Sequence, residues 1–155
     1  MFGKSKEIAV AIPLKVWQDP QSNPLLIFSG SICVVYISCW DDDGVPADYI
    51  CKITFNSGWA SRFYGIEYLP YEIKEFHCSS IYEVKDSKWL KESSERRLQY
   101  YPQWKTWDKK TYHHFVVSGH DDYVEIIAES FTEEIIPIES AKEMLPLFYQ
   151  EVISE

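Results

Sequence analysis

Alternating apolar and polar positions are the strongest pattern along this chain, and they predict a protein built mainly from β-strands. Residues 8–16 place an apolar side chain at every second position, with Pro13 on the other parity, which indicates a strand at a sheet edge or at a bulge. Residues 25–40 predict two strands divided at residues 29–31, and the second is apolar on both faces, as in the centre of a sheet. Residues 49–55 predict the returning strand, and the turn at residues 56–58 predicts a further hairpin.

The clearest single element is a β-hairpin over residues 112–131. Its turn contains a glycine, which permits positive φ, and aspartates that we expect to bond nearby backbone amides. In the second arm, apolar side chains alternate with the carboxylates of Glu125 and Glu129, and Tyr123 and Ile127 are apolar exceptions on the polar face. This alternation predicts a half-buried hairpin with Glu125 on its solvated face.

Helical signals occur in two places. Asp86 and Ser87 provide N-caps for a helix over residues 86–101, which Pro102 ends, and its thin apolar stripe predicts a helix with much of its surface in water. Ser140 and Glu143 form a capping box that predicts a C-terminal helix over residues 140–153. The pattern predicts one α+β domain over residues 1–155, with an antiparallel, strongly twisted or partly rolled sheet of about six to seven strands and both helices packed on it.

Charge and composition narrow the function classes. The net charge of -9 argues against a general nucleic-acid binder and favours basic partners. Aromatic residues make up 16% of the chain, which suits both a sheet-rich core and a recognition surface. The N-terminal segment lacks the features of a signal peptide and no apolar run is long enough to span a bilayer, so we expect a soluble, cytoplasmic protein without membrane partners.

Several polar residues near the hairpin are candidates for chemistry. His113 and His114 are neighbours on a strand and point to opposite faces, so they cannot share one metal ion without distortion. We therefore expect no metal and no cofactor. His120, Asp121 and Glu125 are the candidate catalytic groups, in the alternative that the protein is a hydrolase.

Residues 96–110 are the exception to the acidity of the chain, with five basic residues, one acid and four aromatics. Such a stretch can grip single-stranded nucleic acid or another anionic ligand. The favoured interpretation is that Trp104 and Trp107 pack this connection onto the core while the basic side chains balance nearby acids.

Part of the second half of the chain resembles a pattern found in uncharacterised small bacterial proteins. The matching residues are Ser80-Ile81-Tyr82-Glu83-Val84, Ser87-Lys88-Trp89-Leu90, His114-Phe115, Gly119-His120-Asp121, Glu125 and Ala128. The resemblance implies that His120, Asp121 and Glu125 form a unit with Trp89. It carries over no activity and no site residue.

The leading hypothesis from sequence is a non-enzymatic bacterial protein-interaction module, of immunity or antitoxin type, that binds a basic protein. A small-molecule-binding module and the hydrolase are the alternatives. The candidate partner-binding residues, which we expect on one side of the sheet, are Asp41, Asp42, Asp43, Glu125, Glu129, Glu133, Glu134, Trp104 and Trp107. The run Asp41-Asp42-Asp43 lacks the ligand spacing of a calcium loop, so we interpret it as a solvated turn.

Overall fold

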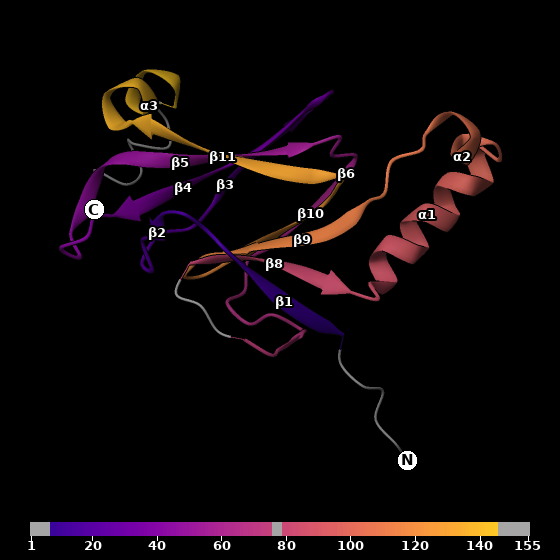
Figure 1. Cartoon of the computed structure of the whole chain (residues 1–155), viewed down its shortest axis with the longest axis horizontal. Helices are drawn as coiled ribbons and strands as arrows, with labels where there is room; N and C mark the ends of the chain where they lie inside the picture. Colours follow the sequence, from indigo (N-terminus) through magenta and orange to yellow (C-terminus); the bar gives the residue numbers. More distant parts are fainter. Residues whose placement is uncertain (1–6, 76–78, 146–155) are drawn as a thin grey trace, which may run out of the picture.

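The computed structural model of the chain describes residues 7–75 and 79–145, which form two β-sheets and three helices (Figure 1). The strands of the first sheet, sheet A, are β1 (Ile8–Pro13), β6 (Ala60–Tyr64), β7 (Glu72–Ile73), β8 (Ser80–Lys85), β9 (His113–Ser118) and β10 (Tyr123–Ala128). Their spatial order is β6-β10-β9-β8-β1-β7. All neighbours in it are antiparallel except β1 and β7.

The second sheet, sheet B, is antiparallel throughout. Its strands are β2 (Trp17–Gln18), β3 (Leu25–Ser29), β4 (Ile32–Trp40), β5 (Pro46–Asn56) and β11 (Ser130–Pro137). They follow the order β11-β5-β4-β2, with β3 also paired to β4. The helices are α1 (Lys88–Tyr100), α2 (Trp104–Trp107) and α3 (Ile138–Met144). The α+β class is confirmed, but the strands divide between two sheets.

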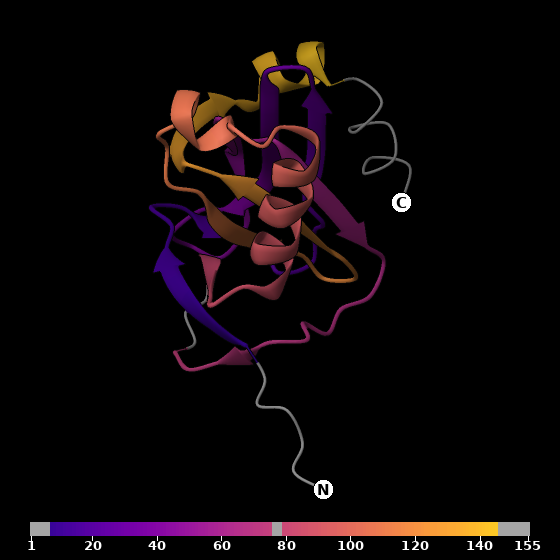
Figure 2. The ribbon, with the colours of Figure 1, turned by 90° about the vertical axis from the view of Figure 1, so that its right-hand side faces the viewer.

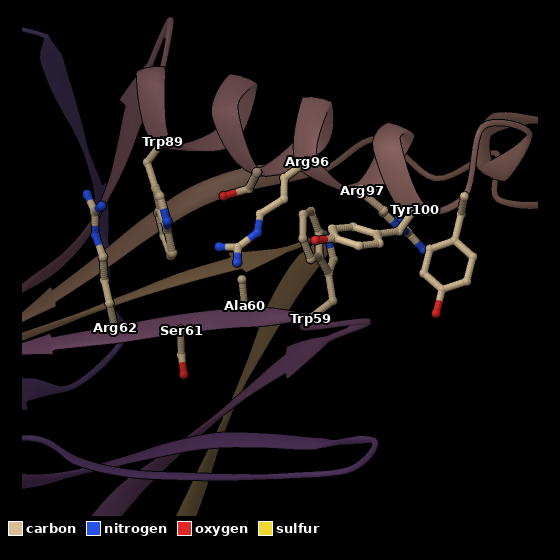
Figure 3. Close-up of a pocket in the computed structure, with 10 residues that line it drawn as sticks. Trp59, Ala60, Ser61, Arg62, Trp89, Arg96, Arg97 and Tyr100 are labelled. Carbon is tan, nitrogen blue, oxygen red and sulfur yellow. The ribbon is translucent and has the colours of Figure 1, made fainter.

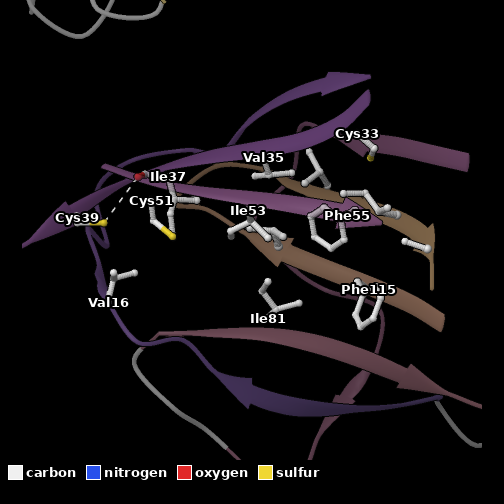
Figure 4. Close-up of a cluster of buried hydrophobic side chains, with 14 of the residues drawn as sticks. Val16, Cys33, Val35, Ile37, Cys39, Cys51, Ile53, Phe55, Ile81 and Phe115 are labelled. Carbon is white, nitrogen blue, oxygen red and sulfur yellow. Dashed lines mark hydrogen bonds between the residues drawn. The ribbon is translucent and has the colours of Figure 1, made fainter. Parts of the chain in front are cut away.

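The main core lies between the two sheets (Figure 4). It joins side chains from sheet B, such as Ile53 and Phe55, to side chains from sheet A, such as Phe115 and Ile126. The rings of Phe55 and Phe115 lie 5.7 Å apart and connect the two layers. Because each strand directs alternate side chains to this interface, its apolar positions follow the period of two seen in the sequence.

The outer faces of both sheets are covered as well. On sheet B, Ala141 of α3 packs against Tyr36 and Ile136. On sheet A, Tyr71 packs over Tyr82 and Val116, and α1 lies beside the same sheet (Figures 1 and 2). The β4 strand is apolar on both faces because the core covers one face and α3 the other, as the sequence predicted.

The hairpin of β9 and β10 is confirmed, with Tyr123 opposite Ser118. Its turn differs from expectation in two respects: Asp121 bonds the side chains of Asn23 and His120, not the local backbone, and Gly119 does not adopt the positive φ that a glycine permits. A Cβ on Gly119 would lie 2.9 Å from the Cα of Asn23, so the absence of a side chain lets the turn pack against this loop.

The turn at residues 56–58 does not form a hairpin. After β5 the chain leaves sheet B and β6 pairs with β10 in sheet A, so the expected hairpin there was wrong. The crossing is held by backbone bonds from Trp59 to Ile127 and from Glu129 to Asn56. The chain crosses back between β10 and β11, so two adjacent crossings link the sheets.

Both predicted helices are present, but the predicted N-terminal cap is correct for only one of them. The Ser87 side chain caps α1 by accepting the backbone N–H of Leu90, and α1 has no fully buried residue, as expected. The described part of the C-terminal helix begins at Ile138, before Ser140, and has no side-chain cap, so the predicted capping box is wrong. The remainder of that prediction, to residue 153, lies outside the described residues. In the part of the chain that is described, no helix is long and apolar enough to cross a membrane.

Cys33, Cys39 and Cys51 are buried free thiols. Burial raises the pKa of Cys33 and Cys39 to about 11 and that of Cys51 to about 12, so these groups are unreactive thiols at neutral pH. Cys78 lies outside the described residues.

Candidate functional site

An open cavity of about 610 Å³ lies between α1 and β6 (Figure 3). On one side it is lined from α1 and the residue that follows by Trp89, Ser93, Arg96, Arg97, Tyr100 and Tyr101. On the other side it is lined from β6 and the residue that precedes it by Trp59, Ala60, Ser61 and Arg62. Three guanidinium groups and four aromatic side chains therefore border one cavity in a protein of net charge -9.

Helical spacing explains the first wall. Trp89, Ser93, Arg96 and Tyr100 are separated by intervals of three or four residues, so they share one face of α1. In Figure 3 the Arg96 side chain extends from α1 towards Ala60 of β6, while Arg62 rises from β6 beside Trp89. The polar ends of both walls thus converge on the same space.

A buried polar network lies under the cavity and centres on Glu125. This carboxylate is only 1% exposed and receives hydrogen bonds from Arg62, Tyr71 and His114. Arg62 stands directly opposite Glu125 in the β6–β10 register, and its guanidinium lies 4.2 Å from the ring centre of Trp89. Burial alone would raise the pKa of Glu125, but these hydrogen bonds outweigh it and hold the pKa below the ordinary 4.5.

The expectation that Glu125 lies on a solvated face was therefore wrong. The same face of β10 carries Tyr123 and Ile127, both buried, and it is covered by Tyr71 and by the N-terminal part of α1. In the sequence, the apolar residues Tyr123 and Ile127 were the sign that this face of the strand is covered. Glu125 cannot contact a partner at the surface, because its oxygens are enclosed by the network.

The network continues to the start of α1. His114 Nε2 lies 2.8 Å from Glu125, and its Nδ1 lies 2.7 Å from the hydroxyl of Ser87, the N-cap of α1. The order serine, histidine, carboxylate matches that of a hydrolytic triad. Ser87 is only 4% exposed and its hydroxyl accepts the Leu90 N–H, so the chain of bonds anchors α1 to sheet A and does not present a nucleophile.

Arg97 closes the other end of the cavity. Its guanidinium donates to Asp108 at 3.0 Å and lies 4.4 Å from the ring centre of Trp104. A hydrogen bond from Tyr112 lowers the pKa of Asp108, and those from Lys110 and Arg97 lower it further, so this carboxylate stays charged. The prediction that basic residues of this stretch balance acids is confirmed for Arg97, whose partner lies in the same stretch.

Trp104 and Trp107 have different environments. Trp104 is 5% exposed and packs on Arg97, as the sequence interpretation expected. Trp107 is 62% exposed, so it is not packed into the core. Trp107 remains accessible to a partner, whereas Trp104 does not.

The candidate catalytic residues separate into two places. His120 Nδ1 lies 2.9 Å from Asp121 on the exposed hairpin turn. Glu125 faces Arg62 and His114 on sheet A, and no hydrogen bond joins it to either turn residue within the described ranges. The unit implied by the resemblance therefore holds only for Glu125, which meets Trp89 through Arg62 and His114.

The acidic candidates do not form one surface. Asp41 bonds the backbone of Asp43 in the β4–β5 turn, which confirms that this run forms a turn. Glu133 accepts the backbone N–H of Lys15, and Glu134 follows it on β11, so the two point to opposite faces. Glu129 accepts a long hydrogen bond from Ser57.

Sequence reasoning missed the roles of Arg62, Tyr71 and His114, which meet only through long-range pairing. It found Arg96 and Arg97 as part of the basic stretch, without their common cavity. Over residues 7–75 and 79–145, no group of three or more His, Cys, Asp or Glu is arranged to hold a metal ion. No protein-family model matches the chain, and the searches of curated proteins and of solved structures found no match.

Proposed function

We propose that this protein is a ligand-binding module whose binding site is the cavity between α1 and β6. The observation that carries the proposal is the gathering of Arg62, Arg96 and Arg97 with four aromatic side chains around one open cavity. Binding sites of small molecules are concave and mostly aromatic or apolar, with a few convergent polar groups. This cavity has that composition.

The surroundings support binding by a prepared site. Arg62 is fixed by Glu125 and Tyr71, and Arg97 is fixed by Asp108, so two of the three guanidiniums are already oriented. The cap of α1 is tied to the same network through His114 and Ser87. A site whose side chains are held in place loses less entropy when a ligand binds.

Filling the cavity provides the test. Ser93→Phe places a phenyl ring in the space between α1 and β6. It is expected to lower the affinity for aromatic ligands roughly tenfold or more, because the new ring and the ligand would occupy the same volume. The measurement is a fragment screen by NMR that follows the indole N–H signals of Trp59 and Trp89. Ser94→Phe, on the same helix but outside the cavity lining, is the matched control.

Fragments that shift the two indoles in the native protein and in Ser94→Phe, but not in Ser93→Phe, support the proposal. A screen in which no fragment moves either indole, or in which Ser93→Phe responds as the native protein does, contradicts it.

A second candidate function, binding of a basic protein, is favoured by a different observation. Trp17 is 39% exposed and lies beside the acidic β4–β5 turn, where a Cβ on Gly44 would be 3.6 Å from its ring. Asp42 and Asp43 are exposed on that turn. An accessible aromatic ring flanked by carboxylates is the arrangement expected where charge guides the encounter and an aromatic anchors it.

Charge reversal tests this second candidate. Asp42→Lys is expected to slow association with a basic protein captured from the source cells by roughly tenfold at low salt, and the difference should shrink as the screening length falls from about 10 Å at 0.1 M to about 3 Å at 1 M. Glu139→Lys, a reversal at another exposed position, on α3, is the control. Equal effects of the two reversals would argue against the turn as the contact surface.

A further inference from the structure

The guanidinium groups of the α1–β6 cavity differ in their charge balance. Arg62 is ion-paired with Glu125, and Arg97 is ion-paired with Asp108. Arg96 is exposed on α1, and no carboxylate lies within ion-pair distance of it among residues 7–75 and 79–145. Of the three positive charges, two are thus neutralised by the protein, and Arg96 supplies the one that remains.

The aromatic side chains of the cavity also differ in how accessible their rings are. The guanidinium of Arg62 covers the ring of Trp89, which also makes a T-shaped contact with the ring of His114, and Trp59 is packed against Arg97 and Tyr112. By contrast, Tyr100 is 72% exposed and Tyr101 is 62% exposed. The tyrosine rings are therefore the faces on which a planar group can stack. Tyr100 lies on the same helix as Arg96, and Tyr101 directly follows that helix.

We infer that the cavity selects a planar aromatic ligand with a single negative charge, such as an aromatic carboxylate; this inference rests on the proposed function. Arg96 binds the carboxylate through paired N–H donors, and Tyr100 and Tyr101 stack on the ring. The Arg62–Trp89 pair forms the fixed end wall.

Electrostatics sets the limit of one charge. A second negative charge on the ligand would meet no uncompensated cation in the cavity lining, because Glu125 and Asp108 already occupy the other two guanidiniums. It would also be repelled by the net charge of -9 of the whole chain. Polyphosphates and nucleic acids therefore fit this cavity less well than a monoanion does.

Calorimetry with four compounds on the full chain tests the inference. 2-Naphthoate is the aromatic monoanion, 2-naphthamide its uncharged counterpart, naphthalene-2,6-dicarboxylate the dianion and cyclohexanecarboxylate the non-aromatic monoanion. 2-Naphthoate is expected to bind roughly tenfold or more tightly than each of the other three, because only it satisfies Arg96 and the tyrosine rings together.

Arg96→Gln tests the role assigned to Arg96. It is expected to lower the affinity for 2-naphthoate roughly tenfold and to leave the affinity for 2-naphthamide unchanged, since only the charged compound uses the guanidinium. Lys91→Gln removes an equal charge from an exposed position of α1 outside the cavity and is the control. Partial rescue by Arg96→Lys, which restores the charge without the paired donors, further supports the assignment.

The outcomes separate the two proposals. Tighter binding of the dianion, or equal binding of 2-naphthoate to Arg96→Gln and the native protein, overturns the inference. If none of the four compounds binds while other fragments still shift the indoles of Trp59 and Trp89, the inference fails and the proposed function stands. If no compound of any kind perturbs those indoles, the proposed function fails as well.

Discussion

Replacing Glu125 with glutamine is expected to lower the free energy of unfolding by about 3 kcal/mol, because removing one partner of a buried ion pair leaves the other charge uncompensated. Glu125 is 1% exposed and is shared by Arg62, Tyr71 and His114. The expected cost is near the lower end of the range for buried pairs, since the Arg62 side chain is 32% exposed and retains some contact with water. Urea denaturation measures the change.

The pH dependence of stability separates the charge of Glu125 from its shape. Its folded-state pKa is below the ordinary value of 4.5, so the carboxylate stabilises the fold above its unfolded-state pKa and loses this effect as pH falls through the folded-state pKa. The native protein should therefore lose part of its stability in acid, and Glu125→Gln should lose less over the same range.

The control for this variant is Glu129→Gln. Glu129 is half-buried, and among the described residues its carboxylate accepts only a long hydrogen bond from Ser57, so we expect a change within roughly 0.5 kcal/mol, as for most surface substitutions. A similar loss of stability in both variants would contradict the assignment of Glu125 as the centre of the network, and so would an unchanged acid transition in Glu125→Gln.

The network also shows why the site was only partly predictable. Ser87 was recognisable as an N-cap, because capping depends on residues within one turn of the helix. Its second contact, to His114, joins residues 27 positions apart, and Arg62 and Glu125 are 63 positions apart. Local patterns assign each side chain to a face of its strand but do not say which element covers that face. For β10, Tyr123 and Ile127 were the only local sign of α1 and Tyr71 above it.

The same limit applies to the fold. Period-two alternation located β4, β5, β9 and β10 because one face of each strand meets the core. The turn at residues 56–58 looks like the end of a hairpin, but a turn sequence does not determine the partner of the strand that follows. Here β5 is already paired with β4 and β11, so β6 pairs with β10 in the other sheet. Long-range pairing decides between the two topologies.

The packing of Phe55 between the two sheets gives the second large expected effect on stability. Phe55 on β5 is 1% exposed, and its ring lies 5.7 Å from that of Phe115 in sheet A and 5.9 Å from that of Phe131 on β11. Phe55→Ala is expected to cost about 3 to 5 kcal/mol in unfolding free energy, because it removes buried apolar surface and leaves a cavity between two layers that cannot both collapse into it. Thermal or urea denaturation provides the measurement.

Two further variants show whether that loss of stability arises from the contact between the sheets. Phe55→Leu keeps most of the volume and is expected to cost less than roughly 1.5 kcal/mol. Phe63→Ala removes a side chain that is 56% exposed on β6 and is expected to stay within roughly 0.5 kcal/mol. A loss of unfolding free energy in Phe63→Ala as large as that in Phe55→Ala would show that the loss does not depend on the contact between the sheets.

Phe55→Ala also separates stability from binding. Phe55 lies in the core between the sheets, whereas the cavity is built on the other face of sheet A from α1 and β6, and Phe55 is not among its lining residues. Under conditions where the variant remains folded, its affinity for an aromatic ligand should equal that of the native protein, even though the midpoint of denaturation has fallen. A loss of affinity in the folded variant would mean that the position of α1 over sheet A depends on packing between the sheets, and that the Ser87–His114–Glu125 contacts alone do not fix the cavity walls.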